Sequence, residues 1–372
     1  MTLQKNPGAV RRYTWLLRFA SWLQSIPSRI TPPPFRLVQI GSAFWQSCAL
    51  HAATRLDIAT VLGDDTLDAD EIAHRVSAQP DATYRLLRML AALGVFEETA
   101  PRRFRNNRLS TCLREDDPHS VRAMILMHNS AAMSRPWYEH LEQGIRGGGV
   151  PFELTHDETL VGYMDTHPDF DALFSSAMDS VEALAGDSFA TDFDWGRFAR
   201  VIDVGGSKGS KALAILKRHP HLKALVTDRA GIIAGAHAYW NGREDAALLA
   251  RMEFQAGDVL EAVPAARDEG DIYLLSAVLH GFDDGAAARA LGTLAAATAG
   301  TGARIALLEM VLPEAGADFA AAAFDMQMFM GTGGRERTLE QWQGLFRHGG
   351  VVLEEEVSLQ SFGKLLVLRA AG

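Results

Sequence analysis

The stretch after Trp195 alternates short apolar runs with segments of helical periodicity, and this alternation constrains the fold more than any other feature. The apolar runs predict strands at residues 200–205, 224–228, 252–256, 272–278, 305–312, 351–357 and 365–368. Strands separated by helices form a mostly parallel, doubly wound sheet with helices on both faces. The sequence therefore predicts an α/β, Rossmann-like domain in residues 191–372, with its ligand outside the carboxyl ends of the strands.

A glycine-rich turn follows the first of these strands, in the sequence Asp203-Val204-Gly205-Gly206-Ser207-Lys208-Gly209. Glycines here allow a tight turn and a close approach of the backbone to a ligand. The spacing matches neither the Gly-x-Gly-x-x-Gly fingerprint of dinucleotide sites nor a phosphate-binding P-loop. A nicotinamide-dependent dehydrogenase is therefore the least favoured of the enzymes considered.

Two acids follow the next two strands at positions that suit a nucleoside. Asp228 ends the second strand, where a carboxylate can accept hydrogen bonds from both ribose hydroxyls. Asp258 follows the third strand, where it can accept a hydrogen bond from an adenine amino group. The order of strand, turn, acid and second acid predicts a nucleoside-containing ligand.

Composition limits the other classes of function. The 372 residues are enough for two domains, and a formal net charge of −10 argues against a broad nucleic-acid surface. Cys48 and Cys112 can form no disulfide framework, and no Cys/His spacing resembles a zinc site, so we expect no metal and a reducing compartment, the cytoplasm. No apolar run approaches the roughly 18 residues of a membrane-spanning helix, so we expect no stable membrane insertion.

Residues 1–37 form a basic extension without acids, and Tyr13–Ile26 mixes aromatic and aliphatic residues at helical spacing. Arg18 interrupts the apolar segment, which argues against a signal peptide. Two interpretations remain open: a helix that packs on a partner subunit, or a helix that lies on a membrane surface. Pro32, Pro33 and Pro34 predict the end of any helix and a short, stiff linker.

Residues 38–190 are predicted to be mostly helical, with helix starts near Asp68 and Asp81. The basic run that follows resembles a short β-wing, which gives the order of a winged helix. Its arginines suit a DNA backbone, and the same module also suits a dimer interface. The wing arginines are Arg102, Arg103, Arg105 and Arg108, and the candidate pocket residues of this region are Met124, Met127, His128, Asn129, Met133, Trp137, Phe174 and Met178.

From about residue 38 onward, the sequence resembles S-adenosylmethionine-dependent O-methyltransferases of the caffeic-acid and bacterial small-molecule type, which include enzymes acting on phenazines and polyketides. The resemblance is carried by the glycine-rich turn, Val-Thr-Asp228-Arg, Gly-Asp258-Val, the segment Leu279–Asp284, Leu-Leu-Glu309-Met and Gly-Gly-Arg-Glu336-Arg-Thr. It implies a class I methyltransferase domain in residues 191–372. It also implies that residues 38–190 form a winged-helix dimerisation and substrate-lid domain, through which the chain forms a homodimer.

The resemblance implies a site of three parts. His280 is the expected general base, oriented by Glu309 and Glu336. The expected S-adenosylmethionine contacts are Asp203, Gly205, Gly206, Ser207, Gly209, Asp228, Arg229, Gly257, Asp258, Val259 and Ser276. The expected acceptor pocket comprises Met127, His128, Met133, Trp137, Phe174, Met178, Asp325, Met328 and Phe329, and its apolar and aromatic character favours a flat aromatic or polycyclic secondary metabolite.

The chain departs from the family next to its expected base. Gly281 and Phe282 replace an acid and a tryptophan, and Ser276 stands where relatives often have lysine. Other interpretations therefore stay open: an N-methyltransferase, a relative that binds the cofactor without transferring its methyl group, or a DNA-binding regulator with a ligand-sensing domain. His280 itself also suits a cap on a helix that starts near Asp283.

Overall fold

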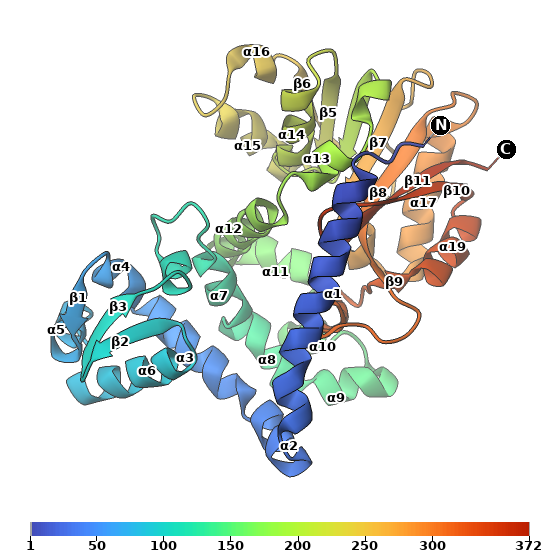
Figure 1. Ribbon diagram of the computed structural model, residues 1–372. Helices are drawn as coiled ribbons and strands as arrows, with labels where there is room; N and C mark the ends of the chain where they lie inside the picture. Colours follow the sequence, from blue (N-terminus) through green and yellow to red (C-terminus); the bar gives the residue numbers. More distant parts are fainter. Residues whose placement is uncertain (1, 372) are drawn as a thin grey trace. The chain divides into compact units, whose positions relative to one another are not determined.

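The computed structural model describes residues 2–371, apart from the side chains of residues 24, 25, 27–29, 182, 183, 185 and 237 (Figure 1). The chain divides into two compact units. Met1–Ser21 and Ala185–Gly372 form the C-terminal unit, and Trp22–Leu184 forms the helical unit. This division separates the first residues of the basic extension from its remainder, whereas the sequence analysis treats residues 1–37 as one segment.

The helical unit consists of helices and one small sheet of order β1-β3-β2. Its elements, which begin with the second part of α1, are α1 (Pro7–Ile30), α2 (Pro33–Gly41), α3 (Ala43–Arg55), α4 (Ile58–Leu62), β1 (Thr66–Asp68), α5 (Ala69–Arg75), α6 (Pro80–Ala92), β2 (Phe96–Ala100), β3 (Arg103–Asn106), η1 (Ser110–Leu113), α7 (Arg122–His128), α8 (Ala131–Glu139), α9 (Leu141–Gln143), η2 (Gly144–Gly148), α10 (Pro151–His156), α11 (Leu160–Thr166) and α12 (Pro168–Ala185).

Local sequence explains how two of these helices begin. The Asp68 side chain accepts a hydrogen bond from the backbone N–H of Asp70, which caps α5 as the sequence indicates. Helix α1 ends at Ile30, as the prolines predict, but the linker consists only of Thr31 and Pro32, because α2 begins at Pro33. The first turn of a helix tolerates proline, since the N–H that proline lacks has no partner within the helix there.

The C-terminal unit contains the large sheet. Its elements, after the first part of α1, are α13 (Ser188–Asp192), η3 (Trp195–Arg197), β4 (Arg200–Val204), α14 (Ser210–Arg218), β5 (Lys223–Asp228), α15 (Ala230–Trp240), α16 (Ala246–Leu249), β6 (Met252–Ala256), β7 (Asp271–Ser276), η4 (Leu279–Gly281), α17 (Asp284–Thr298), β8 (Arg304–Leu312), α18 (Phe319–Thr332), β9 (Arg337–Thr338), α19 (Leu339–His348), β10 (Val351–Ser358) and β11 (Gly363–Ala370).

The strand order in this sheet is β10-β11-β8-β7-β4-β5-β6, and the short strand β9 pairs with β8. Strands β4 to β8 pair in parallel, whereas β11 pairs antiparallel with both β8 and β10. The predicted α/β class and mostly parallel sheet are confirmed. Strand β9, which has only two residues, was not predicted from the sequence.

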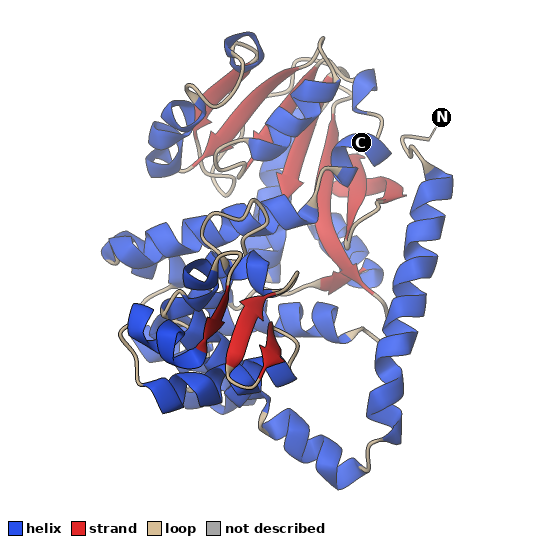
Figure 2. Ribbon diagram, turned by 60° about the vertical axis from the view of Figure 1, so that its left-hand side comes forward, coloured by secondary structure: helices blue, strands red, loops and turns tan. Residues whose placement is uncertain are grey.

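Helices cover both faces of the large sheet (Figure 2). Successive strand residues point to opposite faces, and each face has its own apolar core. Val201 of β4 packs in the core that includes α13 and α14, and its neighbour Ile202 packs in the core that includes α17 and α19. Burial on both faces explains why these strands are continuous apolar runs in the sequence.

The first residues of the chain are anchored to the C-terminal unit. Leu3 is buried in its core, and Gln4 forms a β-bridge with Phe193. The Lys5 N–H donates to the Asp192 carbonyl at 2.6 Å, and the Leu3 N–H donates to the Glu355 carboxylate at 2.9 Å. Helix α1 therefore starts from an anchored segment. Among the described residues, no helix combines the length and apolar character needed to cross a membrane.

Candidate active site

The carboxyl ends of β4, β5, β6 and β7 share one edge of the sheet, because these strands are parallel. The predicted cofactor residues lie at this edge or directly after it. Asp203 is buried within β4, Asp228 is the last residue of β5, and Ser276 is the last residue of β7. The remaining members follow β4, β5 and β6 in the turns that connect these strands to the next elements: Gly205, Gly206, Ser207, Gly209, Arg229, Gly257, Asp258 and Val259.

Asp228 organises the turn around it. Its Oδ2 accepts a hydrogen bond from the Ser207 N–H at 2.8 Å, and its Oδ1 accepts one from the Arg229 N–H at 2.7 Å. A carboxylate has about four acceptor sites, so each oxygen keeps capacity for a further donor. Asp228 is only partly buried, and this capacity suits the two hydroxyls of a ribose.

Strained backbone follows two neighbouring strands, β4 and β7, at the same edge. Ser207 and Ala277 have φ values of 52° and 53°, which non-glycine residues rarely adopt. Gly205 has a φ of 70°, and a Cβ there would lie 2.8 Å from Val278 Cγ2. Backbone strain of this kind is concentrated at functional sites, where surrounding contacts hold it.

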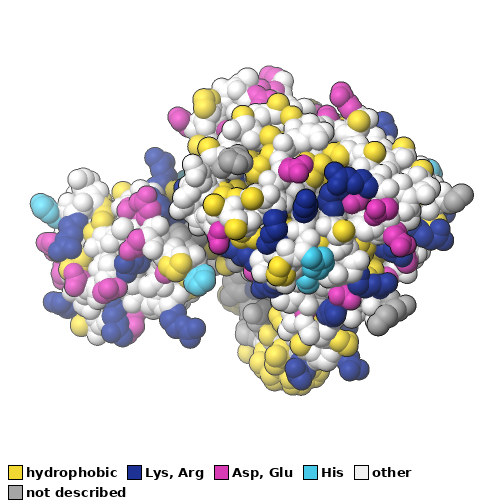
Figure 3. All heavy atoms as spheres, turned by 90° about the horizontal axis from the view of Figure 1, so that it is seen from above, with side chains coloured by type: hydrophobic (Ala, Val, Ile, Leu, Met, Phe, Trp, Pro, Cys, Tyr) yellow, Lys and Arg dark blue, Asp and Glu magenta, His cyan; other side chains and the backbone are white. Residues whose placement is uncertain are grey.

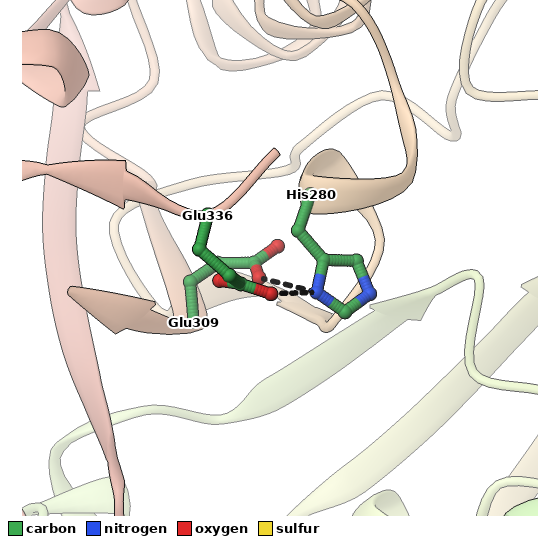
Figure 4. A group of neighbouring side chains, drawn as sticks. All are labelled: His280, Glu309 and Glu336. Carbon is green, nitrogen blue, oxygen red and sulfur yellow. Dashed lines mark hydrogen bonds and ion pairs between the residues drawn. The ribbon is translucent and has the colours of Figure 1, made fainter. Parts of the chain in front are cut away.

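His280, Glu309 and Glu336 meet on the C-terminal unit, although they are far apart in the chain (Figure 4). Nδ1 of His280 lies 2.7 Å from Glu336 Oε1 and 3.9 Å from Glu309 Oε2. The 2.7 Å hydrogen bond places the proton on Nδ1, where it is donated to the carboxylate. Nε2, which Figure 4 shows on the side of the ring away from both carboxylates, then carries a free lone pair.

Both carboxylates are buried, at 2% exposure each. Oε1 of Glu309 accepts hydrogen bonds from the N–H groups of Val278 and Leu279, at 3.2 and 3.0 Å. The second oxygen, Oε2, of Glu309 and of Glu336 accepts no hydrogen bond from any described residue. A buried carboxylate with incomplete hydrogen bonding is costly, so this arrangement favours a functional role over a structural one.

The electrostatics of the cluster fit a proton acceptor. Burial disfavours the charged imidazole, but the negative charges of Glu309 and Glu336 outweigh this effect and raise the pKa of His280. Burial raises the pKa of Glu309 to about 7, although the neighbouring imidazole opposes the rise. The ligand atoms of the three residues lie within 4.8 Å of one another, a spacing that a metal ion also tolerates. The absence of a bound metal stays a prediction.

The capping role for His280 does not fit the structure. Helix α17 begins at Asp284, and its cap is the Asp283 side chain, which accepts a hydrogen bond from the Ala286 N–H at 2.7 Å. The His280 ring instead faces Glu336. The helix therefore needs no contribution from the imidazole.

Arg337 is a residue that the sequence analysis missed. Its fully buried guanidinium donates to the carbonyl oxygens of Leu279 and Phe282, at 3.1 and 3.0 Å, and to Asp284 Oδ1 at 2.8 Å. These partners flank His280 on both sides, so Arg337 holds the turn η4 that carries the imidazole. The Gly-Gly-Arg-Glu-Arg-Thr segment contained the signal, but the partners lie 53 to 58 residues away in the chain.

Gly334 brings the segment that carries Glu336 against this turn. A Cβ on Gly334 would lie 2.1 Å from the His280 carbonyl oxygen and 2.8 Å from the Gly281 carbonyl carbon. The next residue, Arg335, donates its N–H to the same His280 oxygen at 2.9 Å. Only glycine permits this approach of two backbones, which sets the distance between His280 and Glu336.

Helix α18 lies beside the cluster. Asp325 Oδ1 accepts a hydrogen bond from the Glu336 N–H at 2.8 Å, and the ring of Phe324 lies 5.8 Å from the His280 ring. Phe324 was not among the expected pocket residues, whereas Met328 and Phe329 of the same helix were. Both are partly buried, and their contact with an acceptor stays a prediction.

The other expected pocket residues belong to the helical unit. Met127 and Met133 are buried at 2% exposure, and Trp137, Phe174 and Met178 are partly buried. His128 ends α7. The role of these residues in an acceptor pocket stays a prediction.

Three of the four arginines of the predicted wing already have partners. Arg102 pairs with Asp70 at 2.5 Å, Arg105 forms two hydrogen bonds to Glu97, and Arg103 donates to the Thr66 carbonyl. On the face shown in Figure 3, basic and acidic side chains are interspersed. Both observations disfavour a phosphate-binding surface, which needs clustered and available cations.

Comparison with known proteins identifies the family. The O-methyltransferase domain matches residues 138–352, and the O-methyltransferase dimerisation domain matches residues 38–116. The chain therefore belongs to this family of S-adenosylmethionine-dependent methyltransferases, and the class I methyltransferase fold with an N-terminal dimerisation domain is confirmed.

Individual relatives agree with this assignment. The phenazine O-methyltransferase PhzM of Lysobacter antibioticus is 30% identical over 318 residues, which cover 86% of this chain and 91% of the relative. A phenazine-1-carboxylate N-methyltransferase of Pseudomonas aeruginosa is 31% identical over 340 residues, which cover 90% of this chain and 97% of the relative. The crystal structure of LaPhzM superposes with a TM-score of 0.84 at 27% identity, covering 91% of this chain and all of that one.

The cofactor of the family is S-adenosylmethionine. An O-methyltransferase from neocarzinostatin biosynthesis, with a TM-score of 0.73, 26% identity and coverage of 87% of this chain and 96% of that one, has a crystal structure with S-adenosylmethionine and 2-hydroxy-5-methyl naphthoic acid. The present chain fits this cofactor, because the partly exposed Asp228 carboxylate at the carboxyl edge of the sheet can still accept hydrogen bonds from ribose hydroxyls.

We predict that Asp228→Ala weakens binding of S-adenosylhomocysteine by about a hundredfold or more, because the variant loses hydrogen bonds from both ribose hydroxyls and each bond to a charged group contributes roughly 1.5–3 kcal/mol. Isothermal titration calorimetry measures the affinity. Asp268→Ala is the control, since the Asp268 side chain accepts a hydrogen bond from the Gly270 N–H but precedes β7, at the opposite edge of the sheet. Equal affinities of the two variants would contradict a ribose contact by Asp228.

We predict that Gly334→Ala lowers the free energy of unfolding by about 1–3 kcal/mol, because the new methyl group overlaps the His280 backbone. Gly281→Ala is the control, since a Cβ there meets no atom within 4 Å. Denaturant unfolding of both variants measures the difference. If Gly334→Ala is as stable as Gly281→Ala, the close approach is not a constraint on the fold.

Proposed function

We propose that the chain transfers the methyl group of S-adenosylmethionine to a hydroxyl of a small aromatic or polycyclic secondary metabolite, with His280 as general base. The observation that carries this proposal is the 2.7 Å contact between His280 Nδ1 and the buried Glu336. It favours the tautomer in which Nδ1 carries the proton and Nε2 is able to accept one. Relatives that act on phenazines and a neighbour with a bound naphthoic acid support the class of acceptor.

When bound, S-adenosylmethionine supplies a methyl group on a positively charged sulfur. The neutral thioether, S-adenosylhomocysteine, is a good leaving group, so the donor needs no further activation. The protein has to make the acceptor oxygen nucleophilic and to hold it in line with that methyl group. His280 Nε2 removes the hydroxyl proton, and the resulting imidazolium is stabilised by Glu336 and Glu309. Arg337 and Gly334 keep the imidazole and the Glu336 carboxylate at hydrogen-bond distance.

An amine acceptor is the second candidate, because one of the similar relatives is an N-methyltransferase. A neutral amine already has a nucleophilic lone pair, so it needs no base before the transfer. The polarised imidazole of His280 therefore favours a hydroxyl, whose nucleophilicity depends on loss of a proton.

We further propose that the chain forms a homodimer through the helical unit. The match of residues 38–116 to the O-methyltransferase dimerisation domain supports this assembly. The ion pairs of the wing arginines support it as well, since they leave this module with few cations for DNA.

The test of the base uses matched acceptors, namely hydroxylated and aminated forms of the same phenazine and naphthoic acid rings. We expect methylation of hydroxyl acceptors, and a loss of about 10²–10⁴-fold in turnover in His280→Ala with unchanged affinity for S-adenosylhomocysteine. His348→Ala is the control, because His348 is exposed and its Nδ1 contacts only the Gly344 carbonyl of its own helix among the hydrogen bonds described. Formation of S-adenosylhomocysteine measures turnover. Methylation of amines alone, with His280→Ala fully active, would contradict the base.

The pH profile gives a second test. Only the neutral imidazole accepts a proton, so kcat/KM should rise with pH, with a midpoint above the ordinary histidine pKa of about 6.5. Glu336→Gln removes a charge that stabilises the imidazolium. We expect its midpoint to move to lower pH while the plateau falls. Glu340→Gln, at an exposed position in α19, should leave the profile unchanged. An unshifted midpoint in Glu336→Gln would argue against coupling between Glu336 and the base.

A further inference from the structure

Helix α1 presents a continuous apolar surface to solvent. We call this surface the apolar stripe; it consists of Trp15, Leu16, Phe19, Trp22, Leu23 and Ile26. An α-helix advances about 100° per residue, so these positions share one face of the helix. Trp15 is 63% exposed and Trp22 is 51% exposed, although tryptophan is usually well buried. An exposed patch of this kind marks an interaction site.

The opposite face of α1 is already in use. Val10, which lies across the helix axis from the stripe, is buried at 5% exposure, and Leu17 on the same side as Val10 is partly buried. The preceding residues are fixed to the C-terminal unit through the bridge between Gln4 and Phe193. The stripe therefore lies on the opposite side of the helix axis from Val10 and Leu17.

The spacing within the stripe suits another helix. Trp15, Phe19, Trp22 and Ile26 follow one another at intervals of four, three and four residues, which is the pattern of a helix that packs along a helical partner. Leu16 and Leu23 widen this seam on one side. The rings of Trp15 and Phe19 stack at 5.5 Å, which gives this part of the surface a defined shape.

Further exposed apolar surface occurs on α2 and α3, the next two helices in the chain. Phe35, Leu37 and Val38 on α2 are 67–69% exposed, and Trp45 on α3 is 60% exposed. The match to the dimerisation domain starts at residue 38, so it includes the later part of this surface and excludes α1. Two short connections, of two residues and one residue, join the three helices.

Charge indicates the same partner. Residues 1–56 contain seven basic residues and no acid, whereas the whole chain has a net charge of −10. The remainder of the chain is therefore strongly acidic. A second copy brings the same net negative charge to the basic segment, and attraction between opposite net charges favours association.

We propose that the apolar stripe of α1 is an interface with a second copy of this chain, and that it extends the dimer interface beyond the dimerisation domain. The inference rests on the homodimer proposed above. It assigns a role to a segment outside both matched domains. It also selects between the two interpretations of the N-terminal helix, in favour of a partner subunit over a membrane surface.

The test measures the dissociation constant of the full-length dimer by sedimentation equilibrium. In Phe19→Glu/Trp22→Glu, each copy places charges in the apolar seam, so we expect the dissociation constant to rise by about tenfold or more. Ser21→Glu is the matched control, since Ser21 is exposed on another face of the same helix. Titration with S-adenosylhomocysteine verifies that each variant is folded, and Leu16→Gln/Leu23→Gln provides a milder second change with the same expected direction.

Three other outcomes would overturn the inference. A wild-type chain that is monomeric would refute the homodimer together with the stripe. A dimer that the stripe variants leave unchanged would refute the role of the stripe alone. A wild-type chain that floats with phosphatidylserine-containing vesicles, with flotation lost in the stripe variants and dimerisation unchanged, would assign α1 to a membrane surface.

Discussion

The burial of two carboxylates beside one imidazole is the constraint on which the site depends. Charged groups removed from water are costly unless hydrogen bonds and opposite charges compensate. Two backbone N–H groups and His280 supply part of that compensation to Glu309, and His280 supplies it to Glu336. The negative charges of the two glutamates raise the pKa of His280, and burial raises the pKa of Glu309. A cluster in this state gains stability when the imidazole takes up a proton, which is what a general base requires.

The same constraint explains the residues around the cluster. A carboxylate stabilises an imidazolium only at close range, so the turn η4 and the segment carrying Glu336 need fixed positions. Arg337 provides this through backbone carbonyls on both sides of His280, and its own buried charge is paired with Asp284. Gly334 provides it by the absence of a side chain. One short segment, from Gly334 to Arg337, therefore positions both partners of the hydrogen bond.

The sequence predicts the sheet better than the connections and the site. The central strand β4 was predicted to within one residue, because an apolar run buried on both faces is a strong signal. The strand at 252–256 has the predicted bounds as well, although β6 lies at the edge of the sheet and only Met252 is buried. The strand predicted to reach residue 278 ends at Ser276, since Ala277 has a positive φ that no local pattern indicates. The helix at Pro33 was missed because proline signals both a helix end and a first turn. Arg337 and Phe324 were missed because their contacts with the His280 region join residues more than 40 positions apart.

The departures next to His280 are compatible with an intact cluster, because the turn is held by its backbone. Arg337 contacts carbonyl oxygens, which are the same whatever the side chains, and Gly334 approaches main-chain atoms of His280 and Gly281. A Cβ at position 281 would meet no atom within 4 Å. No neighbouring group therefore packs against the place of the acid that the family resemblance leads us to expect at this position. Phe282 packs against the core that α17 and α19 share. Arg337 and Gly334 therefore hold the imidazole through main-chain atoms, and this geometry requires no side chain at position 281.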